Sequence, residues 1–528
     1  MRFSFNPSDL VNSAPLLLLV AAGLLLLLLD AFSRSRLVGK DYMKAMPAET
    51  SEAVMLPVAG SRNYLMALTA LSLLATLVLL AWQAGSVGDK GLLLYRDMLI
   101  VDRFGLLVSG ICVVGALIGV LGAPAYLKAH RMEFGEYYAL ILFVLSGIVI
   151  LIQANDLVTV FLGVETMSLG AYVLTGSWRR SARSSEAAMK YFLVGAFVSG
   201  LLVYGIALIY GTTGSTSFSR MREVTGYMQN APLFYLGWML LLVSFAFKIG
   251  AVPFHMWAPD TYEGAPTPVS GFMMSAVKTA GFAALIRLLV GALPAAALTS
   301  YTGWVYPLQV LAVLTMTLGN LAALRQDNVK RMLAYSSISH AGYLLIGLVA
   351  LGVIGDEARG PILYYLLAYT LTVVGSMGVV AWLGADEKGE ERVHLSDWAG
   401  LASREPAAAL AMTISLLSLA GFPPTAGFFG KFYLFRVALG TPTQAAGAGM
   451  DLLWLVLVAI ANSLVSVYYY LRLITALYFR PAPAKPATVP IRSAALAGSV
   501  LLATLLILGF GLLPEWFSNL SVAATLGR

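Results

Sequence analysis

Apolar stretches long enough to cross a lipid bilayer follow one another along almost the whole chain. A helix needs about 20 mainly apolar residues to span the hydrocarbon core. Hydrophobic residues make up 59% of the 528 positions and charged residues only 12%, so polar residues are too few to cover a water-facing surface. The sequence therefore predicts an all-α protein that crosses the lipid bilayer many times.

Windows of about 19 residues predict about fourteen spans, and no connecting segment is long enough to fold alone. The spans are expected near residues 14–32, 64–84, 104–126, 137–153, 156–176, 189–211, 232–250, 266–290, 303–323, 331–353, 361–384, 405–437, 451–479 and 492–514. We therefore expect residues 1–528 to form a single membrane domain.

Most basic residues lie in the loops that follow odd-numbered spans. Those loops include Lys128, Arg131, Arg179, Arg180, Arg183, Arg325, Lys330 and Arg404, whereas the opposite loops carry mainly Lys90, Arg96, Arg220, Arg222 and Arg359. The positive-inside rule then predicts that both termini lie outside the cytoplasm. Since the net charge of +7 is spread over short loops without interleaved aromatic residues, we expect no nucleic-acid partner.

The seventh predicted span carries Lys248 inside an apolar run and Pro253 five residues later. Proline lacks an N–H group and its ring crowds the carbonyl of Ile249, so the helix must open near the lysine. Freed backbone at membrane depth is tolerated only where it is buried in protein or lines a wet cavity. This pattern predicts a discontinuous helix at an internal site.

The twelfth span predicts a second break, where Pro423 and Pro424 precede Lys431. Paired interruptions in two halves of a chain are typical of inverted repeats with the working site near the middle of the membrane. The eighth span adds a third lysine, Lys278, at the end of a small and polar stripe that includes Thr267, Ser270, Gly271 and Ser275.

Charged groups inside the spans are few and costly. Glu165, Lys248, Lys278 and Lys431 together would cost on the order of 10 kcal/mol if they had no role, which is comparable to the whole stability of a domain. A desolvated lysine exchanges protons more readily near neutral pH, and a nearby carboxylate opposes this effect. We therefore interpret these four residues as proton-transfer groups, with a contact between Glu165 and Lys248 that forms and breaks.

Other polar residues in the spans leave alternatives open. Lys190 opens the sixth span, where it either extends its amine to the interface or supports the buried charges. His340 shares a helical face with Ser336 and Ser337, as a hydrogen-bonded buried histidine or as a proton relay. The tyrosines at 468–470 are interpreted as interfacial or packing residues.

The sequence contains no pattern typical of a cofactor site. Catalytic triads, phosphate-binding loops, dinucleotide fingerprints, haem ligands and metal-ligand spacings are not found, and the single cysteine, Cys112, lies in an apolar span. We expect no cofactor, metal or redox centre in this chain, and we interpret Cys112 as a packing residue.

At the sequence level, the run from Lys248 to Ser270, KIGAVPFHMWAPDTYEGAPTPVS, resembles the antiporter-like membrane subunits of respiratory complex I, NADH:quinone oxidoreductase. The runs at residues 186–197, 328–338 and 421–432 agree with it, and the resemblance covers roughly residues 100 to 480. It implies a fold of fourteen helices with two inverted five-helix repeats, at 137–290 and 303–479, each containing a discontinuous helix.

The resemblance also implies roles for the buried charges. Glu165 matches the carboxylate that pairs with Lys248, and Lys190 matches the lysine beside that pair. Lys278 matches the central lysine of a hydrophilic axis, and Lys431 matches the lysine of the second broken helix. The implied function is translocation of H⁺ driven by quinone reduction elsewhere in the complex. NADH, FMN, Fe–S clusters and quinone would belong to partner subunits, in a hetero-oligomer in the bacterial plasma (inner) membrane.

Two other functions remain open at this level. The same fold serves multisubunit Na⁺/H⁺ antiporters and membrane-bound hydrogenases, and the stretch from Asp260 to Gly264 together with the chain length argues against them. Alternatively, the chain is a structural membrane scaffold whose buried charges only fix the register of its helices.

Overall fold

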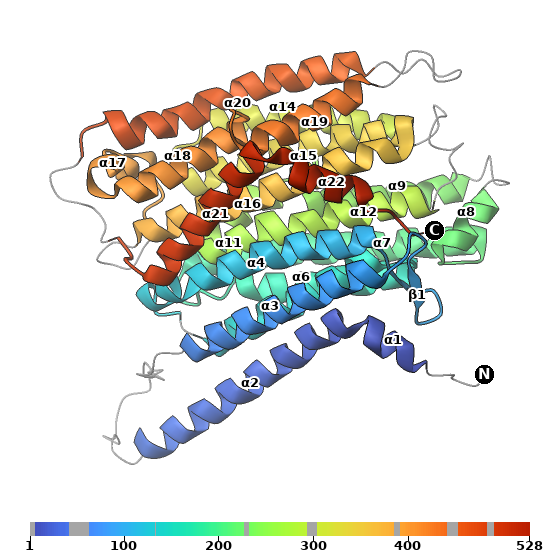
Figure 1. Cartoon of the computed structure of the whole chain (residues 1–528), viewed down its shortest axis with the longest axis horizontal. Coiled ribbons are helices and arrows are strands. Elements are labelled where there is room, and N and C mark those ends of the chain that lie inside the picture. The colour runs from blue at the N-terminus through green and yellow to red at the C-terminus, as the bar shows by residue number, and fades with distance from the viewer. Residues whose placement is uncertain are drawn as a thin grey trace.

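Long helices lie side by side with roughly parallel axes and make up nearly all of the structure (Figure 1). The computed structural model describes residues 6–41, 63–132, 134–225, 232–292, 304–384, 391–440, 452–482 and 490–527. Within these residues the strands form one antiparallel hairpin, in which Leu93 of β1 (Leu92–Leu94) faces Ile100 of β2 (Leu99–Val101). The predicted all-α class is confirmed.

Twelve helical segments of the described residues are apolar and long enough to cross a membrane. One of them, Val329–Leu383, holds two helices, and a broken segment at 406–439 adds a further crossing, so the fourteen predicted spans are all found. The crossing helices are α2 (Ala14–Asp41), α3 (Asn63–Ser86), α4 (Arg103–Ala129), α5 (Gly135–Gln153), α6 (Leu157–Thr175), α7 (Ala182–Thr213), α9 (Pro232–Ile249), α11 (Thr267–Phe272) with η1 (Met273–Val277) and α12 (Lys278–Ala292), α14 (Val305–Leu324), α15 (Val329–Ile354), α16 (Arg359–Leu383), α18 (Pro406–Ala420) with α19 (Ala426–Leu439), α20 (Leu453–Phe479) and α21 (Ala494–Leu512).

Short elements sit between the crossing helices or at their ends. They are α1 (Pro7–Asn12), α8 (Phe218–Thr225), α10 (Trp257–Gly264), η2 (Gly355–Ala358), η3 (Leu395–Trp398), α17 (Leu401–Arg404) and α22 (Pro514–Ala523). Both described ends of the chain lie at the end of the bundle that also carries the β-hairpin and α8, and α17 lies at the opposite end (Figure 1). The backbone N–H of Tyr95 donates to Asp9 (3.2 Å) and that of Gly527 to Asp102 (2.9 Å), which holds both ends of the chain at that end of the bundle.

The first predicted break begins where α9 ends. Gly250 has a φ of 72°, which favours glycine, and the N–H of Ala251 donates to the carbonyl of Ala246 (2.7 Å) across five residues. This pattern is typical of a Schellman helix end. The chain becomes helical again at Trp257, whose indole N–H donates to the carbonyl of Phe247 (3.0 Å), which also accepts from the N–H of Gly250 (3.0 Å).

The second break repeats this geometry. Gly421 has a φ of 87°, and the N–H of Phe422 donates to the carbonyl of Leu417 (2.9 Å). An added Cβ at Gly421 would also lie 2.9 Å from the side chain of Lys431, so this glycine leaves room for the lysine as well as ending the helix. Each break therefore combines a helix end with a lysine.

Glycine contacts relate the two halves of the chain. Gly147 of α5 packs against the backbone of Met167 on α6, and Gly319 of α14 packs against the backbone of Ser339 on α15. The two glycines are 172 positions apart, and so are their two partners. The contacts of Gly170 with Val144 and of Gly342 with Met316 repeat at the same spacing. The helix pairs α5–α6 and α14–α15 are thus packed at corresponding positions.

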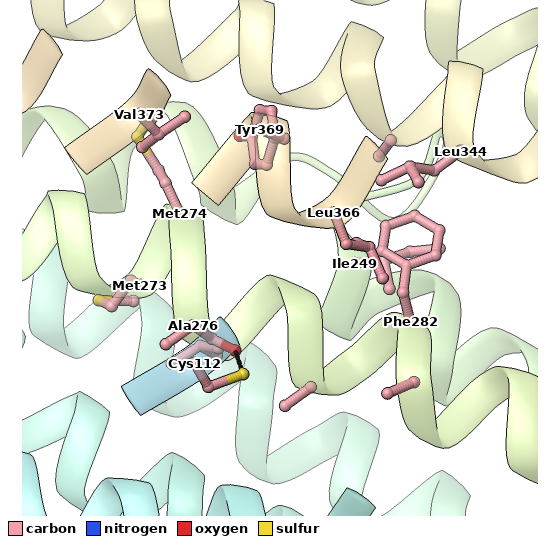
Figure 2. Packing of buried hydrophobic residues seen from close by; sticks show 14 of the residues in the cluster. Cys112, Ile249, Met273, Met274, Ala276, Phe282, Leu344, Leu366, Tyr369 and Val373 are labelled. Atoms are coloured by element: carbon pink, nitrogen blue, oxygen red, sulfur yellow. Dashed lines mark hydrogen bonds between the residues drawn. The ribbon is translucent and has the colours of Figure 1, made fainter. Parts of the chain in front are cut away.

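Helix α4 runs along the eighth span and is bonded to it at three levels. The hydroxyl of Tyr126 accepts from the N–H of Thr267 (3.3 Å) near one end, and Arg287 forms a buried ion pair with Asp102 (2.7 Å) near the other. Between these levels the thiol of Cys112 is 3.5 Å from the carbonyl of Ala276 in the π-turn η1 (Figure 2).

The π-turn η1 was not predicted, because the spacing of the polar stripe in this span is that of a regular α-helix. One extra residue in the turn changes the direction of the side chains that follow it, and Lys278 is the first of them.

The glycine contact between α14 and α15 yields a stability prediction. In Gly342→Ala the added Cβ would lie 2.5 Å from the backbone nitrogen of Met316, so the two helices must separate. Such overpacking typically costs about 1–3 kcal/mol. We expect this variant to have a lower thermal-unfolding midpoint than the native chain. The midpoint is measured in mild detergent by tryptophan fluorescence.

Gly110→Ala is the matched control, since Gly110 lies in α4 with open space around it. Alanine is the better helix former by about 1 kcal/mol, so this midpoint should stay the same or rise. Equal midpoints for the two variants would contradict the close approach of α14 and α15.

Candidate functional site

The first predicted group, Glu165 and Lys248, is held apart in the structure. Lys248 is 5% exposed and donates to the hydroxyl of Ser168 (2.7 Å), while the hydroxyl of Ser199 donates to Glu165. Ser168 follows Glu165 by one turn of α6, so the carboxylate is within electrostatic reach of the amine without forming an ion pair.

Lys278 lies at the boundary between the two halves and is 1% exposed. Its amine donates to the carbonyl (2.8 Å) and to the hydroxyl of Ser337 on α15. The hydroxyl of Tyr369 on α16 donates to the same serine oxygen (2.7 Å). The π-turn before Lys278 thus directs its amine to residues of the second half.

His340 has a hydrogen-bond partner on each ring nitrogen. Nδ1 is 2.7 Å from the hydroxyl of Tyr365 on α16, and Nε2 is 3.2 Å from that of Tyr470 on α20, which also bonds the hydroxyl of Ser336. The imidazole lies within electrostatic reach of Lys278 and Lys431. Both expectations for His340, a satisfied buried histidine and a relay, are compatible with this geometry.

Lys431 lies in α19, directly after the second break. Its amine donates to the carbonyl of Ala420 (3.0 Å), which the break leaves free, and to the hydroxyl of Ser463 on α20 (2.9 Å). The side chain is 6% exposed. Among the residues that the structure describes, Lys248, Lys278 and Lys431 all have neutral oxygens as partners and no carboxylate within ion-pair distance.

Two small cavities adjoin these groups, and each has room for about one water molecule. The first is lined by Ser199, Ser244 and Lys248 together with apolar residues of α6, α7 and α9. The second extends from His340 and Tyr369 to Ser418, beside the second break. A water in each cavity would have polar partners on more than one helix.

Lys190 takes part in a different group from the one expected. It forms ion pairs with Glu186 (2.6 Å) and Asp260 (2.9 Å), and 47% of its side chain is exposed. Arg331 of α15 binds Asp260 and Glu263 of α10, each at 2.7 Å. These pairs tie α7, α10 and the N-terminal end of α15 together, and Glu165 and Lys248 take no part in them.

A buried ion pair lies at the same end. Lys330 is fully buried and binds Glu391 (2.7 Å), which also accepts hydrogen bonds from Tyr126 and Thr267. Burial acts to raise the pKa of the Glu391 carboxyl, but the charge of Lys330 and these hydrogen bonds hold that pKa below its usual value. Carboxylate and ammonium groups that are removed from water need such partners.

The sequence pointed to some of these contacts and missed others. It placed Ser336 and Ser337 on the face of His340, but it expected Glu165 rather than Ser168 as the partner of Lys248. It treated Tyr469 and Tyr470 as packing residues, but both are buried and their hydroxyls bond Asn320 (3.0 Å) and Ser336. The tyrosines are spaced along α20, and nothing in the local sequence shows which helix will face them.

Comparison with known proteins gives consistent results. Residues 154–459 match the family described as NADH:quinone oxidoreductase/Mrp antiporter, transmembrane. The chain is 43% identical over 523 residues to NADH-quinone oxidoreductase subunit N 1 of Sorangium cellulosum, covering 97% of this chain and 98% of that protein.

Solved structures have the same fold. A chain of respiratory complex I from Thermus thermophilus matches with a TM-score of 0.73 and 31% identity, over 96% of this chain and 99% of that one. A chain of the Mrp complex from Dietzia sp. matches with a TM-score of 0.76 over 99% and 97% of the two chains, and its 20% identity supports the fold alone.

The buried pair at Lys330 yields a prediction about stability. Lys330→Met leaves Glu391 buried without its cation, which typically costs about 3–5 kcal/mol. In the native chain, the lowered pKa of Glu391 means that its contribution is complete above about pH 4.3 and is lost as the pH falls through the lowered pKa. The measurement is the thermal midpoint in detergent as a function of pH.

Glu391→Gln is the companion variant, because it removes the charge and keeps the shape. Its midpoint should vary less with pH in the acid range than that of the native chain. If the two pH profiles coincide, Glu391 does not carry a stabilising charge.

Proposed function

This chain belongs to the NADH:quinone oxidoreductase/Mrp antiporter family, and we propose that it is the subunit N of a respiratory complex I that moves protons across the membrane. The 43% identity to a curated subunit N extends over nearly the full length of both chains, which favours complex I over the other complexes that use this fold. Quinone reduction in other subunits would supply the driving energy.

One observation carries the proposal for the site. Lys248, Lys278 and Lys431 are buried and have only neutral hydrogen-bond acceptors among the described residues. A permanent ion pair would hold each amine in its charged form. Amines with neutral partners can instead gain and lose a proton, which is what transfer along a row of lysines requires.

We propose that Glu165 and Lys248 form the switch of the first half. In one state Lys248 donates to Ser168, as observed, and in the other it reaches Glu165 one helical turn away. Contact with the carboxylate favours the charged amine, and contact with the serine favours release of its proton. Lys190 would act on this switch only through the ion pairs that hold α10 in place.

The proposed axis continues through Lys278 to Lys431. Ser337 and Tyr369 connect the amine of Lys278 to the surroundings of His340. From there the second cavity reaches Ser418, whose hydroxyl accepts from the N–H of Gly427 (3.2 Å) at the second break. One ordered water would complete this connection.

We further propose repeat boundaries at residues 137–290 and 303–479 and an inner-membrane location with both termini on the non-cytoplasmic side. The glycine contacts repeated at a spacing of 172 positions support the repeats. The orientation rests on the positive-inside rule and on the position of both chain ends at the end of the bundle opposite the most basic loops.

The cofactors of the complex are also part of the proposal. Among the described residues no group of three or more His, Cys, Asp or Glu side chains could hold a metal ion. We propose that NADH, FMN, Fe–S clusters and quinone are bound by partner subunits, and that this chain assembles with the neighbouring membrane subunits. Mass spectrometry of the intact assembly in mild detergent would identify those partners, and copurification with cation/proton antiporter subunits instead would contradict the assignment to complex I.

Substitution of Lys278 tests the proton-transfer role. In Lys278→Ala the row of amines is interrupted, and Lys278→Arg keeps the charge but cannot release a proton at physiological pH. We expect assembly to be retained and proton pumping in reconstituted vesicles to fall by about 100-fold in both variants, a typical contribution of a proton-transfer group. Pumping is measured with a pH-sensitive dye during NADH oxidation.

Lys128→Ala is the control, because Lys128 is an exposed lysine at the end of α4. It should pump like the native assembly. Unchanged pumping by fully assembled Lys278→Ala would support the scaffold reading instead. Pumping that requires Na⁺ in the medium would favour cation/proton exchange.

A further inference from the structure

Each of the three buried lysines lies over the ring of a tyrosine. The distance from the amine nitrogen to the ring centroid is 5.9 Å for Lys248 and Tyr172, 5.8 Å for Lys278 and Tyr369, and 5.0 Å for Lys431 and Tyr343. All three fall within the range of about 6 Å in which a cation is attracted to an aromatic face. The pattern does not follow from the hydrogen bonds of the amines, which go to other residues.

An aromatic face matters more here than at a protein surface. Serine hydroxyls and backbone carbonyls satisfy the N–H groups of these lysines, but they carry no net charge. The face of an aromatic ring has a negative electrostatic potential, and its attraction for a cation grows when water is excluded. In these sites the ring is therefore the group best placed to stabilise the charged amine without an ion pair.

Tyr343 has the shortest of the three distances, and its ring is held by a hydrogen bond at the hydroxyl. It is fully buried in α15, and its hydroxyl accepts a hydrogen bond from Asn320 of α14 (3.1 Å). The side-chain oxygen of Asn320 in turn accepts from Tyr469 of α20 (3.0 Å). These bonds fix the far end of the ring, so its face stays directed at Lys431.

The first half contains a similar arrangement. Tyr172 lies on α6 and Tyr343 on α15, the two helices whose glycine contacts correspond. Tyr172 and Tyr343 are 171 positions apart, one position fewer than the 172 that separate the corresponding glycines. Tyr172 and Tyr343 each face the lysine of the broken helix in their own half, Lys248 and Lys431.

We propose that Tyr343 is a positioning residue for Lys431, whose ring face takes the place of a counter-ion and stabilises the protonated amine. Tyr369 acts in the same way on Lys278, and Tyr172 acts on Lys248 together with Phe247, whose ring centroid lies 5.3 Å from that amine. This inference rests on the proposed function, because it concerns the protonation of lysines that carry protons.

A series of fluorinated rings tests the inference in the intact assembly. Tyr343 is replaced by phenylalanine and by its mono-, di- and trifluorinated forms, which keep the shape of the ring and progressively weaken its negative face. Pumping should fall with each fluorine and reach about one tenth of the phenylalanine value at three, the equivalent of about 1.4 kcal/mol. Native gels verify assembly.

Phe435 provides the matched control. It is a partly buried residue of α19 that packs edge-on against Tyr343 at a centroid distance of 6.2 Å, and it is not the ring that faces the amine. The same fluorinated series at Phe435 should leave pumping unchanged. A second series at Tyr172 should show a weaker dependence than the series at Tyr343, because the ring of Phe247 also lies 5.3 Å from the amine of Lys248.

The outcomes separate this inference from the proposed function. Equal pumping across the Tyr343 series would overturn the inference, and so would a complete loss already in Tyr343→Phe, which would assign the effect to the hydroxyl and Asn320. Lys431→Ala is measured in parallel: if it pumps normally, the proposed function of Lys431 fails. If it does not pump while the ring series is flat, only the role of Tyr343 fails.

Discussion

An ammonium group removed from water is stable only where its surroundings carry a negative electrostatic potential. In this chain the potential around the buried lysines comes from neutral groups and is therefore weak. Lys248, Lys278 and Lys431 receive it from hydroxyl and carbonyl oxygens and from aromatic faces. A stronger partner would trap the proton, and a weaker one would leave the amine neutral. The two helix breaks and the π-turn bring such intermediate partners to each lysine.

The number of helices and the position of the lysines could be predicted because they depend on local chemistry. A window of apolar residues identifies a span, and a proline after Lys248 identifies a break, without knowledge of any distant residue. Each of these features lies within one helical segment.

The partners on other helices could not be predicted in the same way. Ser337 receives Lys278, and Tyr470 meets His340, because helices far apart in the sequence pack together. Hydropathy fixes which segments are helical but not how each helix is rotated about its axis. The π-turn before Lys278 has no proline or glycine pattern to mark it, and it depends on packing against α4.

Helix α4 lies outside both proposed repeats, and its bonds to the eighth span limit how that span can move. Tyr126 holds one end at Thr267, and Asp102 holds the other at Arg287. With both ends fixed, the segment between them cannot slide along its axis. A shift of register within the π-turn would therefore rotate Lys278 about the helix axis. Its amine would then move from one half of the molecule toward the other.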